Sequence, residues 1–239
     1  MSFGYNYEGE ITSFYEERDI VHRLTIPNRV GSKGIPRSAQ MPNPESPQAA
    51  MGNYTMAFNF NSAIFKVLLG YLKPERGEKI LDLGCSRGFY VRKLEGYTDG
   101  VMGVDISETS LKEAVTRKVR YGDITNLEFE ANSFDKAYSL HTVEHIPDLP
   151  RFFSEMARVL MPGGIAIIVY PWEPFRGFQA IGAALRQYKN PFMARKIHLH
   201  RLTPRNIVRL TKGTPLSHLE SKLVLALGLQ YLTVLSKKS

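Results

Sequence analysis

The sequence predicts an α/β protein with a parallel sheet covered by helices on both faces. Two observations lead to this prediction. An apolar segment at residues 79–83 runs directly into a turn that contains Gly84 and Gly88, and from there onward strand-like segments alternate with helix-like ones. Such alternation is typical of βαβ units, whose parallel strands are buried on both sides. The 239 residues are enough to bury one sizeable core.

The elements are predicted in the order in which the chain presents them. Strands are expected at residues 79–83, 101–106, 119–124, 134–140 and 165–170, with two closing strands near 219–225 and 229–235. Helices are expected at residues 11–26, 53–72, 89–94, 149–160, 178–188 and 204–210, with another after Ser107. Ser107 and Thr203 are suitable N-caps, and Pro74 ends the second helix. Residues 161–164 form a turn before the fifth strand, and residues 27–47 are a loop rich in Pro, Gly, Ser and Asn.

Composition and termini favour a cytoplasmic protein. The single Cys85 excludes an intramolecular disulfide framework and fits a reducing compartment. The first residues lack the apolar core of a signal peptide. The apolar tract at residues 223–235 is shorter than the roughly 20 residues that span a bilayer. We therefore expect no transmembrane segment.

The turn after the first strand predicts a nucleotide-type cofactor. Gly84 and Gly88 allow the backbone to approach a ligand and to start a helix at Phe89. The dinucleotide fingerprint requires glycine at positions 84, 86 and 89, but Ser86 and Phe89 occupy two of them. The pattern present is acidic-x-Gly-x-Ser-x-Gly, beginning at Asp82. It resembles motif I of the class I S-adenosylmethionine (SAM) dependent methyltransferases, with Ser86 in place of the usual glycine.

Two further acidic residues follow the next strands. Asp105 comes about twenty residues after Gly84, the spacing at which a carboxylate accepts from the ribose hydroxyls in nucleotide-binding sheets. The alternative is a surface residue that caps the next helix. In the SAM methyltransferases, an Asp placed like Asp123 accepts from the adenine amino group, and Ile124 would pack near the ring. The alternative for Asp123 is a turn-forming Gly-Asp pair.

The segment at residues 134–170 is similar to the methyltransferase type 11 group, in which a Leu-Glu-His-Ile element follows the fourth strand. Here that element reads Val143-Glu-His-Ile146. The resemblance covers residues 79–171. It implies a Rossmann-like, doubly wound sheet of seven strands, mostly parallel with the last strand antiparallel, together with bound SAM and methyl transfer to a nucleophile. The cofactor-binding residues that it implies are Asp82, Gly84, Cys85, Ser86, Gly88, Asp105, Ile106, Asp123, Ile124 and Leu140.

Histidines after the fourth strand raise the question of a base or a metal site. Residues after this strand line the acceptor side in the family, so we choose His141 as the candidate general base. His145 is as well explained by a structural hydrogen bond at a helix start. Zincins place Glu directly after the first His, whereas Glu144 here precedes the second, and no third ligand lies nearby in the sequence. We therefore expect no metal.

The charge is distributed unevenly. Residues 80–170 have a net charge of −3, whereas residues 171–239 hold 12 Lys or Arg and 2 Asp or Glu, a net charge of +10. Solvated helix faces would explain this excess, and so would a phosphorylated metabolite, nucleic acid or acidic lipid surface as partner. The candidate substrate residues are Tyr170, Arg195, His198 and Arg201.

These observations together predict a SAM-dependent methyltransferase acting on a small-molecule or lipid-like acceptor, expected to be anionic. The domain at residues 61–239 would carry a cap-like insertion around residues 171–200, and residues 1–60 would form an N-terminal extension that also caps the substrate. One alternative is an RNA methyltransferase, favoured by the basic C-terminal third. Another is a non-catalytic SAM-binding protein. The oligomeric state and the methylated atom stay open.

Overall fold

The computed structural model describes residues 60–226 and 228–239, which form a seven-stranded sheet in the order β3-β2-β1-β4-β5-β7-β6. The strands are β1 Lys79–Leu83, β2 Gly100–Asp105, β3 Val119–Tyr121, β4 Phe134–Leu140, β5 Leu160–Pro171, β6 Leu216–Leu225 and β7 Leu229–Lys237. The pairs among β1 to β5 are parallel, and β7 runs antiparallel to both of its neighbours. The predicted Rossmann-like fold class, including the antiparallel last strand, is confirmed.

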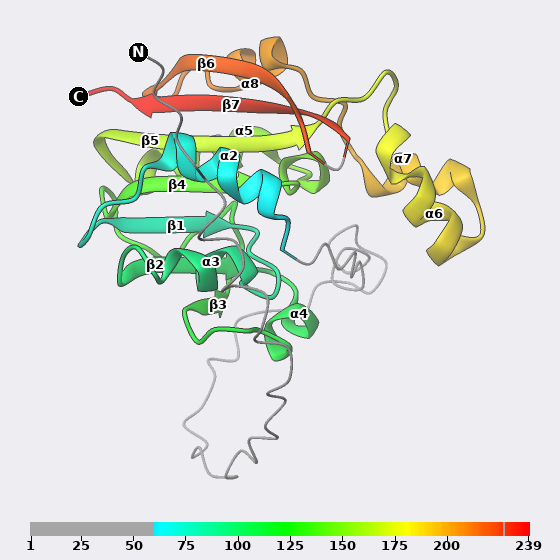
Figure 1. The fold of residues 1–239 in the computed structure, drawn as a ribbon. Helices are drawn as coiled ribbons and strands as arrows, with labels where there is room; N and C mark the ends of the chain where they lie inside the picture. Colours follow the sequence, from blue (N-terminus) through cyan, green and yellow to red (C-terminus); the bar gives the residue numbers. More distant parts are fainter. Residues whose placement is uncertain (1–59, 227) are drawn as a thin grey trace, which may run out of the picture. The chain divides into compact units, whose positions relative to one another are not determined.

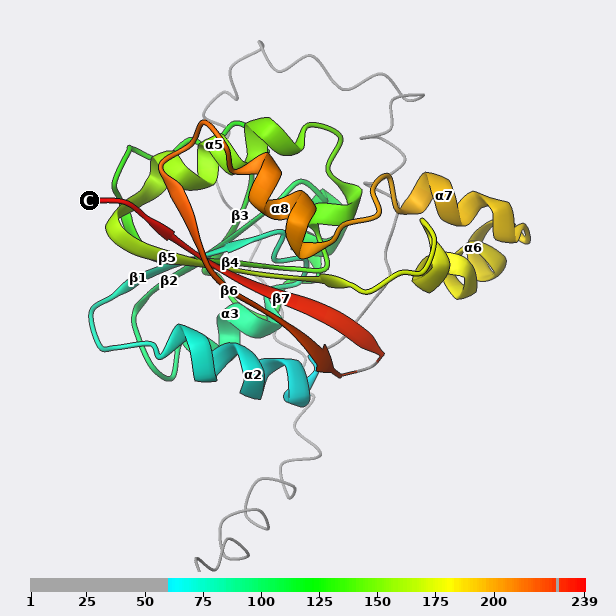
Figure 2. The ribbon, with the colours of Figure 1, turned by 90° about the horizontal axis from the view of Figure 1, so that it is seen from above.

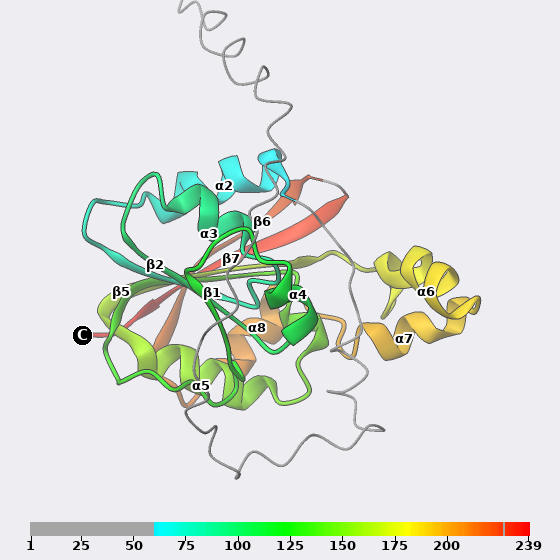
Figure 3. The same cartoon turned by 90° about the horizontal axis from the view of Figure 1, so that it is seen from below.

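Helices cover both faces of this sheet, as Figures 1 and 2 show. One face carries α2 (Ser62–Leu72) and α3 (Phe89–Leu94), and the other carries α5 (Leu149–Val159) and α8 (Pro204–Leu210). Figure 3, the view from below, shows the same division. Each layer buries its own apolar core, with Leu68 and Leu72 on the first face and Phe152 and Phe153 on the second. Burial on both faces explains why the parallel strands read as continuous apolar segments.

Side-chain caps fix where the helices begin. Asn61 accepts a hydrogen bond from the backbone N–H of Ile64, which starts α2 at Ser62. Ser107 caps α4 (Glu108–Lys112), and Thr203 caps α8, as predicted. Such caps satisfy backbone donors that have no partner inside the helix.

The chain leaves the alternating pattern after β5. Residues 172–200, which we call the cap, contain η3 (Phe178–Ala180), α6 (Ile181–Tyr188), η4 (Pro191–Met193) and α7 (Ala194–Ile197). These helices extend past the carboxyl ends of the parallel strands, apart from the helices that cover the sheet (Figures 1 and 2). They share a small core of their own, formed by Ala180, Ala183, Ala184, Ala194 and Ile197.

Three predicted boundaries are wrong. The helix expected from residue 53 begins at Ser62, because Asn61 caps it there in an extended conformation. The third strand ends at Tyr121, three residues early. The turn expected at residues 161–164 lies within β5, where the pairing with β4 shifts register between Phe134 and Lys136. A bulge absorbs the extra residues without ending the strand.

The predicted helix at residues 11–26, the loop at 27–47 and the cap role of residues 1–60 lie essentially outside the described residues. Within the described residues, no helix has both the length and the apolar character to cross a bilayer.

Candidate functional site

A cavity of about 290 Å³ lies at the carboxyl ends of the parallel strands. The chain runs from β1 outward to β3 and then returns to place β4 on the other side of β1. Such a reversal of strand order opens a crevice where ligands bind in α/β sheets. The turns after β1 and β2 line one end of the cavity, and residues after β4 line the other together with the cap residues Gln179 and His198.

The turn after β1 has an unusual backbone. Gly84 has φ 90°, Ser86 φ 49° and Gly88 φ 76°, all in the left-handed region. Ser86 therefore adopts a conformation that glycine adopts at lower cost, which explains why a glycine is usual at its position in motif I. A Cβ atom on Gly84 would collide with the side chain of Thr142, which follows β4. The turn thus tolerates serine at position 86, but no side chain at position 84.

Asp105 ties two of the lining turns together. Its Oδ2 accepts from the backbone N–H of Ser86 at 2.7 Å, and its Oδ1 accepts from that of Ser107 at 2.8 Å. Burial raises the pKa of Asp105, although these backbone donors act in the opposite direction. Asp105 therefore lines the cavity as expected and also holds the loop geometry around it.

Two buried groups lie beneath the turn. Asp82 accepts a hydrogen bond from the Tyr138 hydroxyl at 2.9 Å, and burial raises the pKa of Asp82 to about 8. Burial also raises the pKa of the Cys85 thiol, which therefore stays protonated at neutral pH. Both residues line the cavity.

The other predicted cofactor residues divide into two groups. Ile106, Asp123, Ile124 and Leu140 line the cavity, whereas Gly88 caps α3 behind it. The sequence interpretation missed Asn61, Ile64 and Tyr90, which line the same end from α2 and α3. Asn61 had a detectable signal as an N-cap residue, but its position beside Tyr90 is a tertiary contact.

These residues fit SAM. The left-handed turn places Gly84, Cys85 and Ser86 in the lining of the cavity, and a Cβ on Gly84 would not fit there. Three carboxylates, Asp82, Asp105 and Asp123, line the cavity from three successive strand ends and can accept hydrogen bonds from hydroxyl and amino groups. Apolar side chains of Ile106, Ile124 and Leu140 lie among them and provide a surface for a purine ring.

His141 lies at the opposite end, immediately after β4. Its φ of 51° is in the left-handed region, which is uncommon for residues other than glycine. Such strain concentrates at functional sites. The Nδ1 atom of His141 is 3.5 Å from Oε1 of the buried Glu144. A carboxylate beside an imidazole favours a fixed ring orientation, which is required of a general base.

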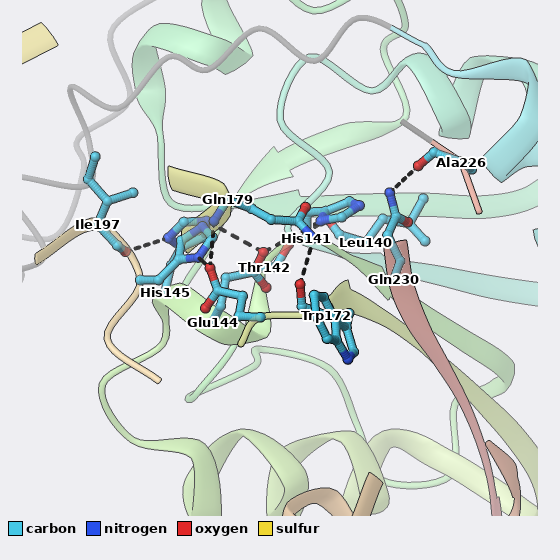
Figure 4. Close-up of polar contacts among 12 residues, drawn as sticks. Leu140, His141, Thr142, Glu144, His145, Trp172, Gln179, Ile197, Ala226 and Gln230 are labelled. Atoms are coloured by element: carbon cyan, nitrogen blue, oxygen red, sulfur yellow. Dashed lines mark hydrogen bonds and ion pairs between the residues drawn. The ribbon is translucent and has the colours of Figure 1, made fainter. Parts of the chain in front are cut away.

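Glu144 is the centre of a buried polar cluster. Burial alone would raise the pKa of Glu144, but the hydrogen bond to His141 and the charges of the neighbouring histidines outweigh it and hold the pKa at about 2. Its Oε1 is 3.9 Å from Nε2 of His145. Figure 4 shows His145 between Glu144 and Ile197, whose carbonyl oxygen is 2.7 Å from the His145 Nδ1.

The cap supplies the rest of this cluster. His198 Nδ1 is 2.8 Å from Oε1 of the buried Glu173. Burial alone would lower the pKa of His198, but this hydrogen bond and the charges of Glu144 and Glu173 together outweigh burial and raise it. The donor atoms of Glu144, His145 and His198 lie within 4.8 Å of one another. The sequence shows no third ligand near His141 and His145, but the fold brings His198 from a distant part of the chain to Glu144 and His145.

The predicted substrate residues are only partly brought together. His198 lines the cavity, but Tyr170 is fully buried, with its hydroxyl 3.0 Å from the Thr233 hydroxyl. Arg195 is exposed on α7. Arg201 lines a separate hollow, and its Nε donates to the Glu173 carbonyl oxygen at 2.7 Å. Tyr170, Arg195 and Arg201 are therefore not among the residues that line the main cavity.

The surface of the cap is both apolar and basic. Its exposed apolar side chains include Phe175, Phe178, Leu185 and Phe192, the last 83% exposed. Residues 174–200 of the cap hold five Lys or Arg and no Asp or Glu. Exposed aromatic groups among cations are characteristic of surfaces that contact anionic lipid.

Comparison with known proteins identifies the central part of the chain. Residues 81–168 match the family model described as a methyltransferase domain. A sterol 24-C-methyltransferase from Gibberella zeae is 37% identical over 112 residues, which are 42% of this chain and 29% of that protein. Phosphoethanolamine N-methyltransferase 1 from Triticum aestivum is 33% identical over 114 residues, or 43% of this chain and 22% of that protein. The chain thus spans less than a third of the length of either relative.

Solved structures share the fold. An S-adenosylmethionine dependent methyltransferase from Mesorhizobium loti superposes with a TM-score of 0.59 at 21% identity, over 74% of this chain and 98% of the other. The likeness extends beyond the family match and includes most of the described sheet.

Proposed function

We propose that this chain, whose residues 81–168 match a methyltransferase domain, transfers a methyl group from SAM to a small-molecule or lipid-like acceptor. One observation carries the proposal. A single cavity is lined at one end by the motif I turn and at the other by His141, Glu144 and cap residues. Donor and acceptor can therefore be held next to each other, which is the main requirement for a direct displacement.

At the cofactor end, the residues of the chain bind and orient. SAM supplies an electrophilic methyl group on a sulfonium with a good leaving group. Asp105 is proposed to accept from the ribose hydroxyls and Asp123 from the adenine amino group. Asp82, which is buried at the bottom of the cavity, would lie near the positive charge of SAM. Without such a charge, burial makes this carboxyl group costly to ionise. Because Gly84 has no side chain, the backbone of the turn can come close to the cofactor and to Thr142.

At the acceptor end, His141 is the proposed general base. Glu144 would hold the imidazole through Nδ1, so that Nε2 takes the proton from a hydroxyl or amine of the acceptor. The Glu144 side chain is 2% exposed and the His141 side chain 26% exposed, so the carboxylate is buried while the imidazole stays accessible to an acceptor. Removal of such a base costs about 10²- to 10⁴-fold in rate.

The cap supports an anionic, lipid-like acceptor. Its exposed aromatic residues and its cations belong to the same cap that contributes Gln179 and His198 to the cavity, and both kinds of group interact favourably with an anionic lipid surface. The similar proteins named above include a sterol and a phosphoethanolamine methyltransferase, whose names indicate small or lipid acceptors. We therefore rank lipids with anionic headgroups first among candidate acceptors.

Labelled SAM with cell extracts divided into lipid, small-metabolite and RNA fractions tests this proposal. We expect methyl incorporation into the lipid or small-metabolite fraction. His141→Gln should lower kcat by about 10²-fold or more with unchanged SAM affinity. Incorporation into RNA alone would contradict the proposed acceptor. Incorporation into no fraction, with SAM bound, would support a non-catalytic SAM-binding protein.

A further inference from the structure

We propose that Glu144, His145 and His198 bind a divalent transition-metal cation of the Zn²⁺ type at the acceptor end of the cavity. The three side chains come from the segment after β4 and from the cap, and their donor atoms lie within 4.8 Å of one another. Two imidazoles and one carboxylate form a donor set that zinc sites with an open coordination position use. The same set also suits Fe²⁺, whereas Mg²⁺ prefers oxygen ligands.

The spacing of the donor atoms fits a shared ion better than direct hydrogen bonds. Oε1 of Glu144 and Nε2 of His145 are 3.9 Å apart, which is too far for a hydrogen bond. Ligand atoms that surround a tetrahedral zinc at 2.0–2.1 Å are about 3.4 Å apart. The Glu144 and His145 atoms would therefore have to approach each other by about 0.5 Å to reach the distances of a metal site. The donor of His198, which lies within 4.8 Å of the other two, would have to approach them by at most about 1.4 Å.

Both histidines are held in the orientation that metal ligands require. The Nδ1 of His145 is 2.7 Å from the Ile197 carbonyl oxygen, and the Nδ1 of His198 is 2.8 Å from the Glu173 carboxylate. Since a carbonyl oxygen and a carboxylate accept, each Nδ1 carries the proton, and each Nε2 has the lone pair that binds a metal. Partners of this kind on the far nitrogen typically accompany metal-bound histidines.

Glu173, the hydrogen-bond partner of His198, is itself held in place by hydrogen bonds. Glu173 accepts from the backbone N–H of Gly177 at 3.1 Å and of Gln179 at 3.0 Å. The backbone oxygen of Glu144 accepts from Leu199 N at 2.8 Å. These bonds fix the cap against the segment after β4, so that the three donors are arranged before any ion arrives.

A second observation points independently to a ligand. Among residues 60–226 and 228–239, Oε2 of Glu144 is one of two buried side-chain oxygens or nitrogens without a hydrogen-bond partner, and the other is Oε1 of Gln230. Both residues line the same cavity. An unpaired buried carboxylate oxygen is unfavourable, and a cation beside Glu144 would remove that cost.

The ion would have a defined role, which rests on the proposed methyl transfer. Because Glu144, His145 and His198 all line the cavity, an ion that they held would be able to bind a hydroxyl, carboxylate or phosphate oxygen of the acceptor. A metal ion lowers the pKa of a bound hydroxyl, which would make its proton easier for His141 to remove. Acceptors with an oxygen donor are therefore favoured over those without one.

Metal titration of the whole chain tests the site without any acceptor. After treatment with chelator and dialysis, Zn²⁺ is titrated by calorimetry, and Co²⁺ is added in a parallel sample as a spectroscopic probe. We expect about one tightly bound ion per chain and visible Co²⁺ absorption bands of a nitrogen and oxygen site. His198→Ala and Glu144→Gln should lower the affinity at least about 10- to 100-fold, and Glu173→Gln, which changes only the support, should lower it by a similar factor.

Controls separate this outcome from loss of the fold and from failure of the proposed function. His218→Ala removes an exposed histidine on β6 and should leave metal binding unchanged. SAM affinity and thermal unfolding are measured for every variant, so that failure of SAM binding tests the methyltransferase proposal separately. Absence of stoichiometric Zn²⁺ binding by the folded wild-type chain would overturn the site. So would binding that is equally strong in His198→Ala and Glu144→Gln, and the cluster would then serve only to fix the cap.

Discussion

The two ends of the cavity are built from different kinds of segment. The cofactor end comes mostly from short turns that follow consecutive strands, in the part of the chain with a net charge of −3. The acceptor end combines the turn after β4 with a cap from the part with a net charge of +10. The donor site is therefore determined by short stretches of sequence, whereas the acceptor site depends on contacts between segments that are distant in the chain. Variants at the two ends should therefore change different measured quantities.

The largest effect is expected at the cofactor end for Gly84→Val. Valine at φ 90° is strained, and its Cβ collides with Thr142. We expect calorimetry to detect no SAM binding. Gly213→Val is the matched control, because Gly213 has the same φ of 90° but no atom within 4 Å of a built Cβ. If a folded Gly84→Val bound SAM as the control does, the motif I interpretation would be wrong.

A smaller loss is expected for Asp105→Ala. The substitution removes the proposed ribose acceptor and leaves the N–H groups of Ser86 and Ser107 without their partner. An unpaired buried polar group costs about 1–3 kcal/mol, or about a 5- to 150-fold loss of SAM affinity. Asp99→Ala, at an exposed side chain, serves as the control. Unchanged SAM affinity in a folded Asp105→Ala chain would refute the assignment.

The pH dependence of SAM affinity should report on Asp82. Its pKa of about 8 means that the carboxyl is largely protonated at pH 7 without ligand, while the cationic cofactor favours the carboxylate. Affinity should therefore rise with pH, by up to about tenfold between pH 7 and pH 9. The same raised pKa predicts that this group contributes less to the stability of the ligand-free chain as pH rises toward 8.

Asp82→Asn is the comparison for this pH series, because it removes the titrating group and leaves the amino group of SAM to titrate. The difference between the two affinity curves is the quantity of interest. Parallel curves for wild type and Asp82→Asn would show that Asp82 does not exchange a proton on binding.

The smallest effect is expected at the cap. Replacement of Arg195 by Ala should weaken binding to phosphatidylglycerol vesicles about fivefold at low salt, because each cation near an anionic surface contributes about 1 kcal/mol. The loss should fade at high salt, and SAM affinity should not change. Co-sedimentation provides the measurement, with Lys112→Ala on α4 as control. Equal vesicle binding by all three chains would remove the lipid surface as partner of the cap.

The contrast between the two ends also explains what the sequence could predict. Asp82, Asp105 and Asp123 each follow an apolar strand, and the carboxyl ends of parallel strands meet at one edge, so their convergence was foreseeable. The meeting of His198 with Glu144 was not, because no periodicity links the cap to the turn after β4. The burial of Tyr170 was not foreseeable for a similar reason. This residue ends the apolar run of β5, but antiparallel β7 covers it, and strand pairing beyond the parallel core leaves no local signal.

A crystal structure of the chain with S-adenosylhomocysteine tests the division of the cavity most directly. We predict that its ribose hydroxyls lie within hydrogen-bond distance of Asp105 and that its adenine lies beside Ile106 and Asp123. The sulfur should then face the end that holds His141, with the cluster of Glu144, His145 and His198 left open for the acceptor. A ligand seated instead against His145 and His198, or outside the cavity, would contradict the assignment of the two ends.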